Sequence, residues 1–84
     1  MILTVITTTS VETAVCGDVT GDNKVTMGDA RRIEMWLLYP EDYPINNLWA
    51  ADVTGDGEVT GDDARRIIMW LSDPEQYPLA CSTP

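Results

Sequence analysis

The sequence predicts a small all-α domain, built from two copies of a loop followed by a helix. The copies are expected in a pseudo-two-fold arrangement with a short linking helix between them. Three observations predict this class. The chain has 84 residues, the size of one small domain. Residues 18–44 and 52–78 repeat with a period of 34 residues and are identical at 19 of 27 positions. In each copy an acidic, glycine-containing phrase precedes apolar residues at helical spacing.

The composition limits the possible functions. Fourteen acidic residues against five basic ones give a net charge of −9, so we expect no nucleic-acid or membrane partner, and cation binding is favoured. The chain has no histidine, and its two cysteines, Cys16 and Cys81, lie far apart. It therefore offers little for zinc binding or nucleophilic catalysis, and we expect no catalytic residue. A core this small is marginal, so a metal ion, a disulfide or a partner is expected to stabilise it.

The chain divides into three parts. Residues 1–15, rich in Thr and Val, are predicted to be a linker or N-terminal extension, residues 16–81 the domain, and residues 82–84 a C-terminal tail. The apolar run at residues 2–6 is too short for a signal peptide and has no basic flank. We therefore expect a module excised from a longer protein, with any export signal on another part of that protein.

Each copy is predicted to fold as a loop that runs into one helix. Turn residues at 20–22 and 54–56 favour the loops, and Pro40 and Pro74 are expected to end the helices. Residues 45–51 are predicted to form the short linking helix. The expected core faces of the two helices are Ala30, Ile33 and Leu37, and Ala64, Ile67 and Leu71.

Oxygen-bearing residues recur through each acidic phrase at places 1, 3, 5, 9 and 12, counted from Asp18 or Asp52. This is the pattern of an EF-hand-type calcium loop, in which place 7 adds a backbone carbonyl. Hard oxygen ligands favour calcium, and the short octahedral shell of magnesium fits such a loop poorly. We therefore predict two Ca²⁺ ions. The predicted ligands are Asp18, Thr20, Asp22, Lys24 (through its carbonyl), Thr26 and Asp29 in the first loop, and Asp52, Thr54, Asp56, Glu58 (through its carbonyl), Thr60 and Asp63 in the second.

Two further features of the loops are predicted. Place 6 needs a left-handed turn, which Gly57 adopts freely and Asn23 adopts next best. Val25 and Val59, at place 8, are expected to join the two loops by packing and a short strand-like pairing. The loops depart from the usual calcium pattern, with Thr at place 3 and Asp in place of Glu at place 12. The alternative is an acidic surface turn that binds no ion.

The phrases "GDVTGD" at residues 17–22 and "ADVTGD" at 51–56, each followed by one helix and lacking the entering helix of an EF-hand, resemble a type I-like dockerin. The resemblance covers about residues 16–80. It implies a calcium-dependent module that docks cellulosomal enzymes or scaffoldins of anaerobic bacteria onto a cohesin. The parent protein would then be secreted to a cell-surface complex that degrades cellulose and other plant polysaccharides. We expect a monomer when the module is free.

The resemblance also implies which residues face the cohesin, at places 10, 11, 17, 18 and 22 of each copy. These are Met27, Gly28, Glu34, Met35 and Tyr39 in the first copy, and Gly61, Asp62, Ile68, Met69 and Asp73 in the second. The Ser-Thr pair typical of the family at places 10 and 11 is absent, which implies a cohesin of another specificity class.

Helical spacing independently turns part of this set away from the core. Met35 and Met69 fall outside the core stripes, and an exposed methionine suits a binding surface. The alternative is that the methionines and Ile68 widen the core. Four arginines complete the predicted docking surface: Arg31, Arg32, Arg65 and Arg66. Arg32 with Trp36, and Arg66 with Trp70, stand at i, i+4 and are expected either to stack as cation–π pairs or to form ordinary surface packing.

Cys16 and Cys81 flank the duplicated region. The ends of a fold with two related halves often meet, and an exported chain permits a disulfide, so we predict one; the alternative is two free thiols. Two other functions fit the sequence less well. A calcium sensor is disfavoured by the missing entering helices and by Asp at place 12, and an enzyme by the lack of suitable residues.

Overall fold

The structure is a computed structural model, and it describes residues 14–82. This part of the chain contains α1 (Met27–Leu38), α2 (Leu48–Ala51) and α3 (Gly61–Ser72), with no strand among its residues. The predicted all-α class is confirmed. Of the predicted N-terminal extension, residues 1–13 lie outside the described residues. None of the helices in residues 14–82 has both the length and the apolar character needed to cross a bilayer.

α1 and α3 begin with the same capping arrangement. The Thr26 hydroxyl accepts a hydrogen bond from the Gly28 N–H (3.2 Å), and the Asp29 carboxylate accepts one from the Thr26 N–H (2.8 Å). Thr60 and Asp63 form the same capping box in α3. Each helix thus starts two residues before place 12, so the last acidic residue of each loop lies in the first helical turn. Loop and helix form one unit.

The ends of the helices follow the sequence expectation. α1 ends at Leu38 and α3 at Ser72, each two residues before a proline, Pro40 or Pro74. The linking helix is confirmed but is shorter than predicted. It has 4 residues and begins at Leu48, because Asn47 caps it by accepting a hydrogen bond from the Ala50 N–H.

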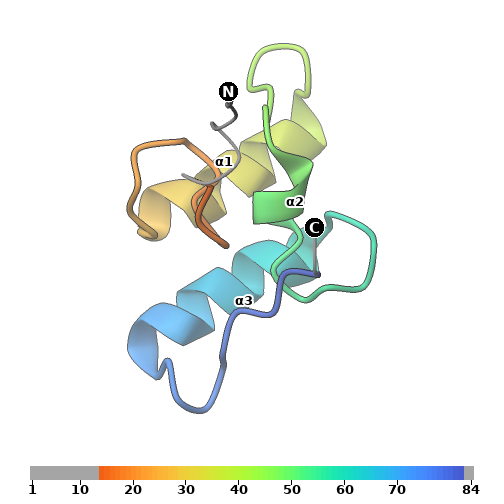
Figure 1. The fold of residues 1–84 in the computed structure, drawn as a ribbon. Coiled ribbons are helices and arrows are strands. Elements are labelled where there is room, and N and C mark those ends of the chain that lie inside the picture. Colours follow the sequence, from red (N-terminus) through yellow and green to blue (C-terminus); the bar gives the residue numbers. More distant parts are fainter. Residues whose placement is uncertain (1–13, 83–84) are drawn as a thin grey trace, which may run out of the picture.

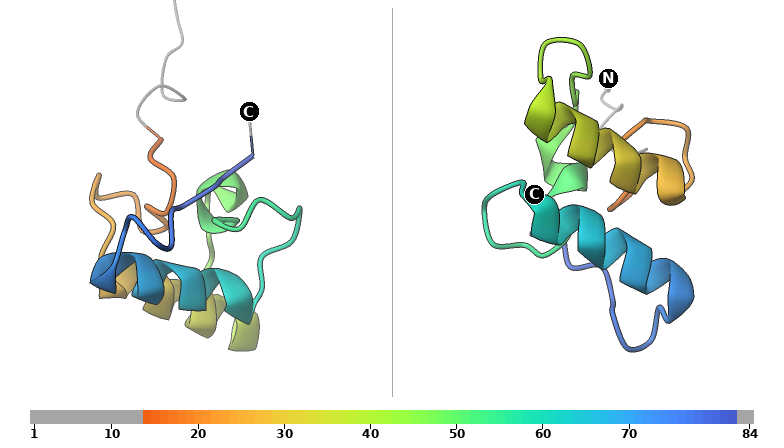
Figure 2. Two further views of the ribbon diagram at one scale, coloured as in Figure 1. Left: turned by 90° about the horizontal axis from the view of Figure 1, so that it is seen from below. Right: turned by 180° about the vertical axis from the view of Figure 1, so that it is seen from behind.

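The helices form two layers (Figures 1 and 2). α1 and α3 lie side by side and antiparallel in one layer, and α2 lies in the other layer with both ends of the described chain. Because the two helices are antiparallel, the acidic loop before α1 and the acidic loop before α3 lie at opposite ends of the pair. The right-hand view of Figure 2 shows the outer face of α1 and α3 with no other described segment in front of it.

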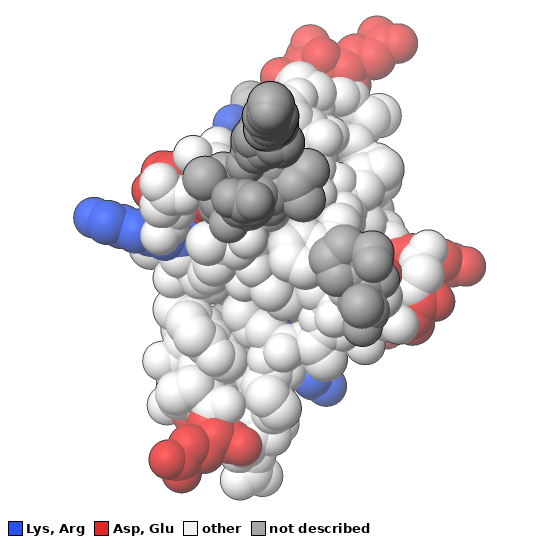
Figure 3. Space-filling model, in the orientation of Figure 1, with Lys and Arg blue, Asp and Glu red and all other residues white. Residues whose placement is uncertain are grey.

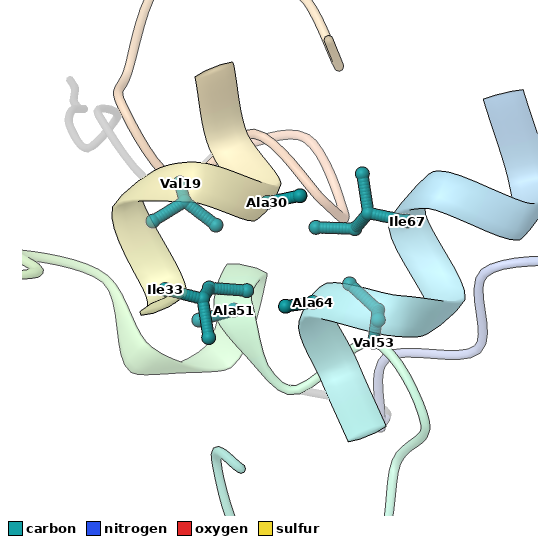
Figure 4. Packing of buried hydrophobic residues seen from close by; sticks show 7 residues of the cluster. All are labelled: Val19, Ala30, Ile33, Ala51, Val53, Ala64 and Ile67. Atoms are coloured by element: carbon teal, nitrogen blue, oxygen red, sulfur yellow. The ribbon is translucent and has the colours of Figure 1, made fainter. Parts of the chain in front are cut away.

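The core between the layers is built from equivalent residues of the two copies (Figure 4). Its members are the pairs Val19 and Val53, Ala30 and Ala64, and Ile33 and Ile67, together with Ala51. Ile33 and Ile67 are both 0% exposed, and burying each such side chain is worth about 1.5–3 kcal/mol. The duplication of the sequence is therefore repeated in the packing.

The expectation that Leu37 and Leu71 belong to the core is wrong. Their exposed fractions are 42% and 38%. The last buried residue of α1 is Ile33 and that of α3 is Ile67, so the buried stripe of each helix ends near its middle. Leu37 and Leu71, one turn further on, lie beyond that stripe.

The predicted strand-like pairing of Val25 with Val59 is also wrong. The described residues form no strand, and the antiparallel helices hold the two loops apart. Each valine instead packs, half-buried, against the common core. Val25 lies beside Gly17, where an added Cβ would come within 3.2 Å of it.

A disulfide joins Cys16 to Cys81, which confirms that prediction (S–S 2.06 Å, Cα–Cα 5.8 Å). Backbone hydrogen bonds fix the chain on both sides of it: the Gly17 N–H donates to Ala50 O (2.8 Å), and the Ala80 N–H donates to Val53 O (2.7 Å). The disulfide therefore links the two ends of the domain within the layer that contains α2. Its first cysteine lies just before the first acidic loop, and its second lies against the start of the second loop.

Candidate metal centres and docking surface

Each acidic loop gathers three aspartates. In the first loop, carboxylate oxygens of Asp18, Asp22 and Asp29 all lie within 4.8 Å of one another. In the second loop, Asp52, Asp56 and Asp63 do the same. The first and last aspartate of each cluster are buried and the middle one is exposed. These are the predicted places 1, 5 and 12, so the structure brings the carboxylates of each predicted site together.

The aspartate at place 12 is held by hydrogen bonds from its own loop. Oδ1 of Asp29 accepts from the Val19 N–H, the Thr20 N–H and the Thr20 hydroxyl (2.9, 2.9 and 3.1 Å). Oδ1 of Asp63 accepts from the N–H and hydroxyl of Thr54 (both 3.0 Å). Since these donors are neutral, they orient the buried side chains without adding positive charge to the cluster.

The aspartate at place 1 organises the turn. Asp18 accepts from the Gly21 N–H and the Asn23 N–H (2.9 and 2.8 Å), and Asp52 accepts from the corresponding amides of its own loop. The turn needs left-handed backbone at place 6, where φ is +69° at Asn23 and +90° at Gly57. The prediction for place 6 is confirmed. Asn23 carries the strain that Gly57 avoids.

The aspartate at place 5 is exposed but stays ionised. The Lys24 N–H donates to Asp22 (3.0 Å) and holds the pKa of that carboxyl below its usual range. The Glu58 N–H has the same effect on the pKa of Asp56. Both carboxylates therefore remain charged at any pH at which an ordinary aspartate is charged.

These oxygen donors fit a hard divalent cation. Three converging carboxylates with only neutral hydrogen-bond partners form a strongly anionic, all-oxygen donor set. The hydroxyls of Thr20 and Thr54 border it through the bonds to place 12. The hydroxyls of Thr26 and Thr60 accept the capping hydrogen bonds of the helices, so their ligand role, and that of the Lys24 and Glu58 carbonyls, stays a prediction.

The predicted docking residues lie along α1 and α3 and at the ends of these helices. Those that are exposed are Met27, Gly28, Arg31, Glu34, Tyr39, Gly61, Asp62, Arg65 and Asp73; those that are half-buried are Arg32, Met35, Arg66, Ile68 and Met69. Ile68 packs against the core cluster and is half-buried, so it widens the core and keeps part of its side chain exposed; its docking role stays a prediction. Neither Met35 nor Met69 belongs to that cluster.

Arg32 and Arg66 each tie a helix to the end of its own repeat. Nη1 of Arg32 donates to Pro44 O (3.1 Å), and Nη1 of Arg66 donates to Pro78 O (2.8 Å). These bonds connect residues 12 positions apart in both copies. Stacking of the arginines on Trp36 and Trp70 stays a prediction.

Two equivalent depressions lie on the surface of the repeats. The first depression, about 330 Å³, is lined by Thr20, Gly28, Arg31, Arg32, Met35 and Tyr43. The second, about 300 Å³, is lined by Thr54, Asp62, Arg65, Arg66, Met69 and Tyr77. Tyr43 and Tyr77 line these depressions and were not predicted as surface-site residues. The signal that was present is the Tyr-Pro pair, which both copies share at the same place.

The opposite side of the molecule has a different character. Figure 3, which shows the side of α2 and the chain ends, has acidic side chains at several of its edges, one basic side chain that projects at the left, and otherwise small basic areas. All four arginines belong to α1 and α3. The basic groups are thus concentrated in the helix layer.

The fold and the sites define a duplicated loop–helix module with a carboxylate cluster able to hold a cation in each half. The family model of the dockerin type I domain matches residues 16–72, and the chain belongs to this family. No protein of curated function and no solved structure matches the chain.

Proposed function

We propose that this chain is a calcium-dependent docking module. It binds two Ca²⁺ ions and a cohesin, and so places its parent protein in an extracellular complex that degrades plant polysaccharides, the cellulosome of an anaerobic bacterium. The module itself docks and does not catalyse. Family membership supports the class of partner, and the two aspartate clusters support the ions.

One observation carries the proposal. The two carboxylate clusters lie at opposite ends of the same antiparallel pair, α1 and α3, whose outer face no other described segment covers. The last acidic residue of each cluster is also in the first turn of its helix. A cation in either loop would therefore fix the position of a helix that forms the open face.

Capture of a cohesin tests the proposal. The chain is immobilised and incubated with a panel of purified cohesins of different specificity classes, in calcium and in excess EDTA. We expect at least one cohesin to be retained in calcium and released in EDTA. Failure to retain any cohesin, or retention that EDTA does not change, would contradict the proposed function.

The two calcium sites are expected to differ in affinity, with the loop of residues 52–63 binding more tightly. Gly57 adopts its left-handed turn without strain, and Glu58 stands where the first loop has Lys24. In water a unit charge about 8 Å from a divalent ion changes its binding constant several-fold, so reversing this charge predicts a difference of several-fold to tenfold or more.

Calorimetry on single-loop variants measures that difference. Asp22→Ala leaves the second loop intact and Asp56→Ala leaves the first, and both removed carboxylates are exposed. The matched change Lys24→Glu should tighten the first site. Equal affinities of the two loops, or a tighter first loop, would refute the expected order.

One docking orientation is expected to dominate. A pseudo-two-fold module offers its partner two orientations related by a half-turn, but the copies differ where contact is predicted. Rotation would bring Glu34 to the place of Ile68. Desolvating an unpaired carboxylate there costs roughly a few kcal/mol, and about 1.4 kcal/mol already shifts a population tenfold.

The pair Met35→Ala and Met69→Ala tests the orientation, because these residues occupy equivalent places in the two copies. Calorimetry against the captured cohesin should show unequal losses of affinity. The opposite outcome is that each single change is nearly silent and only the double change abolishes binding, which would show that the two orientations are interchangeable.

A further inference from the structure

The two depressions of the helix surface differ in charge because they differ at one lining position. Five of the six lining positions carry the same residue type in both: a threonine, two arginines, a methionine and a tyrosine. The sixth is Gly28 in the first depression and Asp62 in the second. The first depression is therefore lined by two guanidinium groups and no carboxylate, whereas the second contains its own carboxylate.

The shape and the remaining groups of the first depression suit one acidic side chain. Arg32 is held in place by its bond to Pro44 O and keeps further N–H donors, and Arg31 is exposed beside it. Arginine holds a carboxylate through paired N–H donors. Met35 offers an apolar wall to the stem of an entering side chain, and Gly28 has no side chain to obstruct it.

The charge balance of the two copies also favours the first depression as the one that accepts an acidic side chain. Residues 18–44 contain six acidic and three basic residues, and residues 52–78 contain seven acidic and two basic ones. An approaching carboxylate is therefore repelled less by the first copy. Glu34, the exposed acid on the same helix, is not among the residues that line the depression.

Thr20 connects this depression to the first aspartate cluster. It lines the depression, and its hydroxyl donates to Asp29 Oδ1 at 3.1 Å. The three carboxylates of that cluster would repel an incoming acidic group, and a divalent cation would cancel most of their charge. Occupation of the depression is thereby linked to the adjacent cation site.

We propose that the first depression receives an aspartate or glutamate side chain from the docking face of the partner, held by Arg31 and Arg32. The second depression does not, because Asp62 already supplies a carboxylate beside Arg65 and Arg66. This rests on the proposed function, and it assigns a chemical identity to one contact of the partner. It also gives a charge-based reason for one orientation to dominate.

The test uses three variants and the cohesin retained in the capture experiment. Gly28→Asp copies the second depression into the first, Gly28→Asn adds the same bulk without charge, and Asp62→Gly makes the reverse change. All three should fold, because α3 carries Asp62 at the equivalent place behind the same capping box. Helical CD in calcium checks this.

Affinity is measured by calorimetry at low and moderate salt. We expect Gly28→Asp to weaken binding at least tenfold and to reduce its salt dependence. Gly28→Asn, which alters the same docking position without adding charge, should weaken binding several-fold less than Gly28→Asp and should keep the salt dependence. Asp62→Gly should strengthen binding, because it removes the carboxylate that keeps an acidic side chain out of the second depression. Equal losses for Asp and Asn at residue 28, or no loss for Gly28→Asp, would overturn the carboxylate proposal and leave docking itself intact. If no cohesin binds the unmodified chain, the proposed function fails and this proposal fails with it.

Discussion

Excess EDTA is expected to abolish most of the helical CD signal of the chain at neutral pH. Each loop forces three carboxylates to within 4.8 Å of one another, and the hydrogen bonds that hold them come from neutral groups. For the buried pair Asp18 and Asp29, repulsion at such a distance is about 1 kcal/mol in water and about 3.5 kcal/mol at an effective dielectric constant of 20. The lowered pKa values of Asp22 and Asp56 keep these two exposed carboxylates ionised at neutral pH, so the middle member of each cluster adds to the repulsion.

The size of the effect follows from linkage. Calcium at 100 times its dissociation constant stabilises the folded state by about 2.7 kcal/mol per site, so two sites contribute about 5 kcal/mol. A small domain has about 5–10 kcal/mol in total. Removing both ions therefore lowers the free energy of unfolding by an amount comparable to the whole stability of the domain. The free energy of ion binding thus contributes directly to the free energy of folding.

The CD signal in EDTA distinguishes a docking module from a calcium sensor. The proposed docking module should pass from unfolded to folded when calcium is added back, so the CD signal should return. A calcium sensor passes between two folded states and would keep its helical signal in EDTA. An unchanged spectrum in excess chelator would contradict calcium-driven folding. A magnesium titration after EDTA is the control for a non-specific effect of divalent charge.

Reduction of the Cys16–Cys81 disulfide is expected to lower the free energy of unfolding by about 4 kcal/mol in saturating calcium. The two cysteines are 65 residues apart, and a cross-link over a loop of this length constrains the unfolded chain by roughly that amount. Urea unfolding with and without a reductant measures the change.

A double variant, Cys16→Ser with Cys81→Ser, separates loss of the disulfide from other effects of the reductant. It should match the reduced chain and should not respond to reductant. A further sample, treated with both EDTA and reductant, measures the combined effect of losing the ions and the disulfide. A loss below about 1 kcal/mol on reduction would show that the ends of the domain are held by the backbone bonds at Gly17 and Ala80 alone.

Patterns that repeat in both copies predicted the fold well. Ala30, Ile33, Ala64 and Ile67 form the core because helical spacing and duplication point to the same face. Leu37 shares that spacing but is exposed, because spacing along one helix does not show how far the neighbouring helix extends. The strand-like pairing of Val25 and Val59 failed for a similar reason. It assumed adjacent loops, whereas antiparallel helices place them at opposite ends.

The candidate sites also differ in how far the sequence alone could predict them. The aspartate clusters were predictable because a calcium loop is local, and each cluster lies within twelve residues of sequence. The depressions were not, since Tyr43 and Met35 come from different parts of a repeat and meet only through the turn that Arg32 closes onto Pro44. The disulfide required both ends of the domain to meet, which duplication suggested and the fold confirmed.

Docking through the outer face of α1 and α3 is tested most directly by an amide chemical-shift map of the labelled chain in calcium, recorded while the captured cohesin is titrated in. The perturbed amides should concentrate in Met27–Leu38 and Gly61–Ser72, with those near Gly28 and Arg31 among the most affected. The amides of α2 and of residues near the Cys16–Cys81 disulfide should change little. A map centred instead on α2 and the disulfide, with α1 and α3 unperturbed, would contradict docking through the helix face.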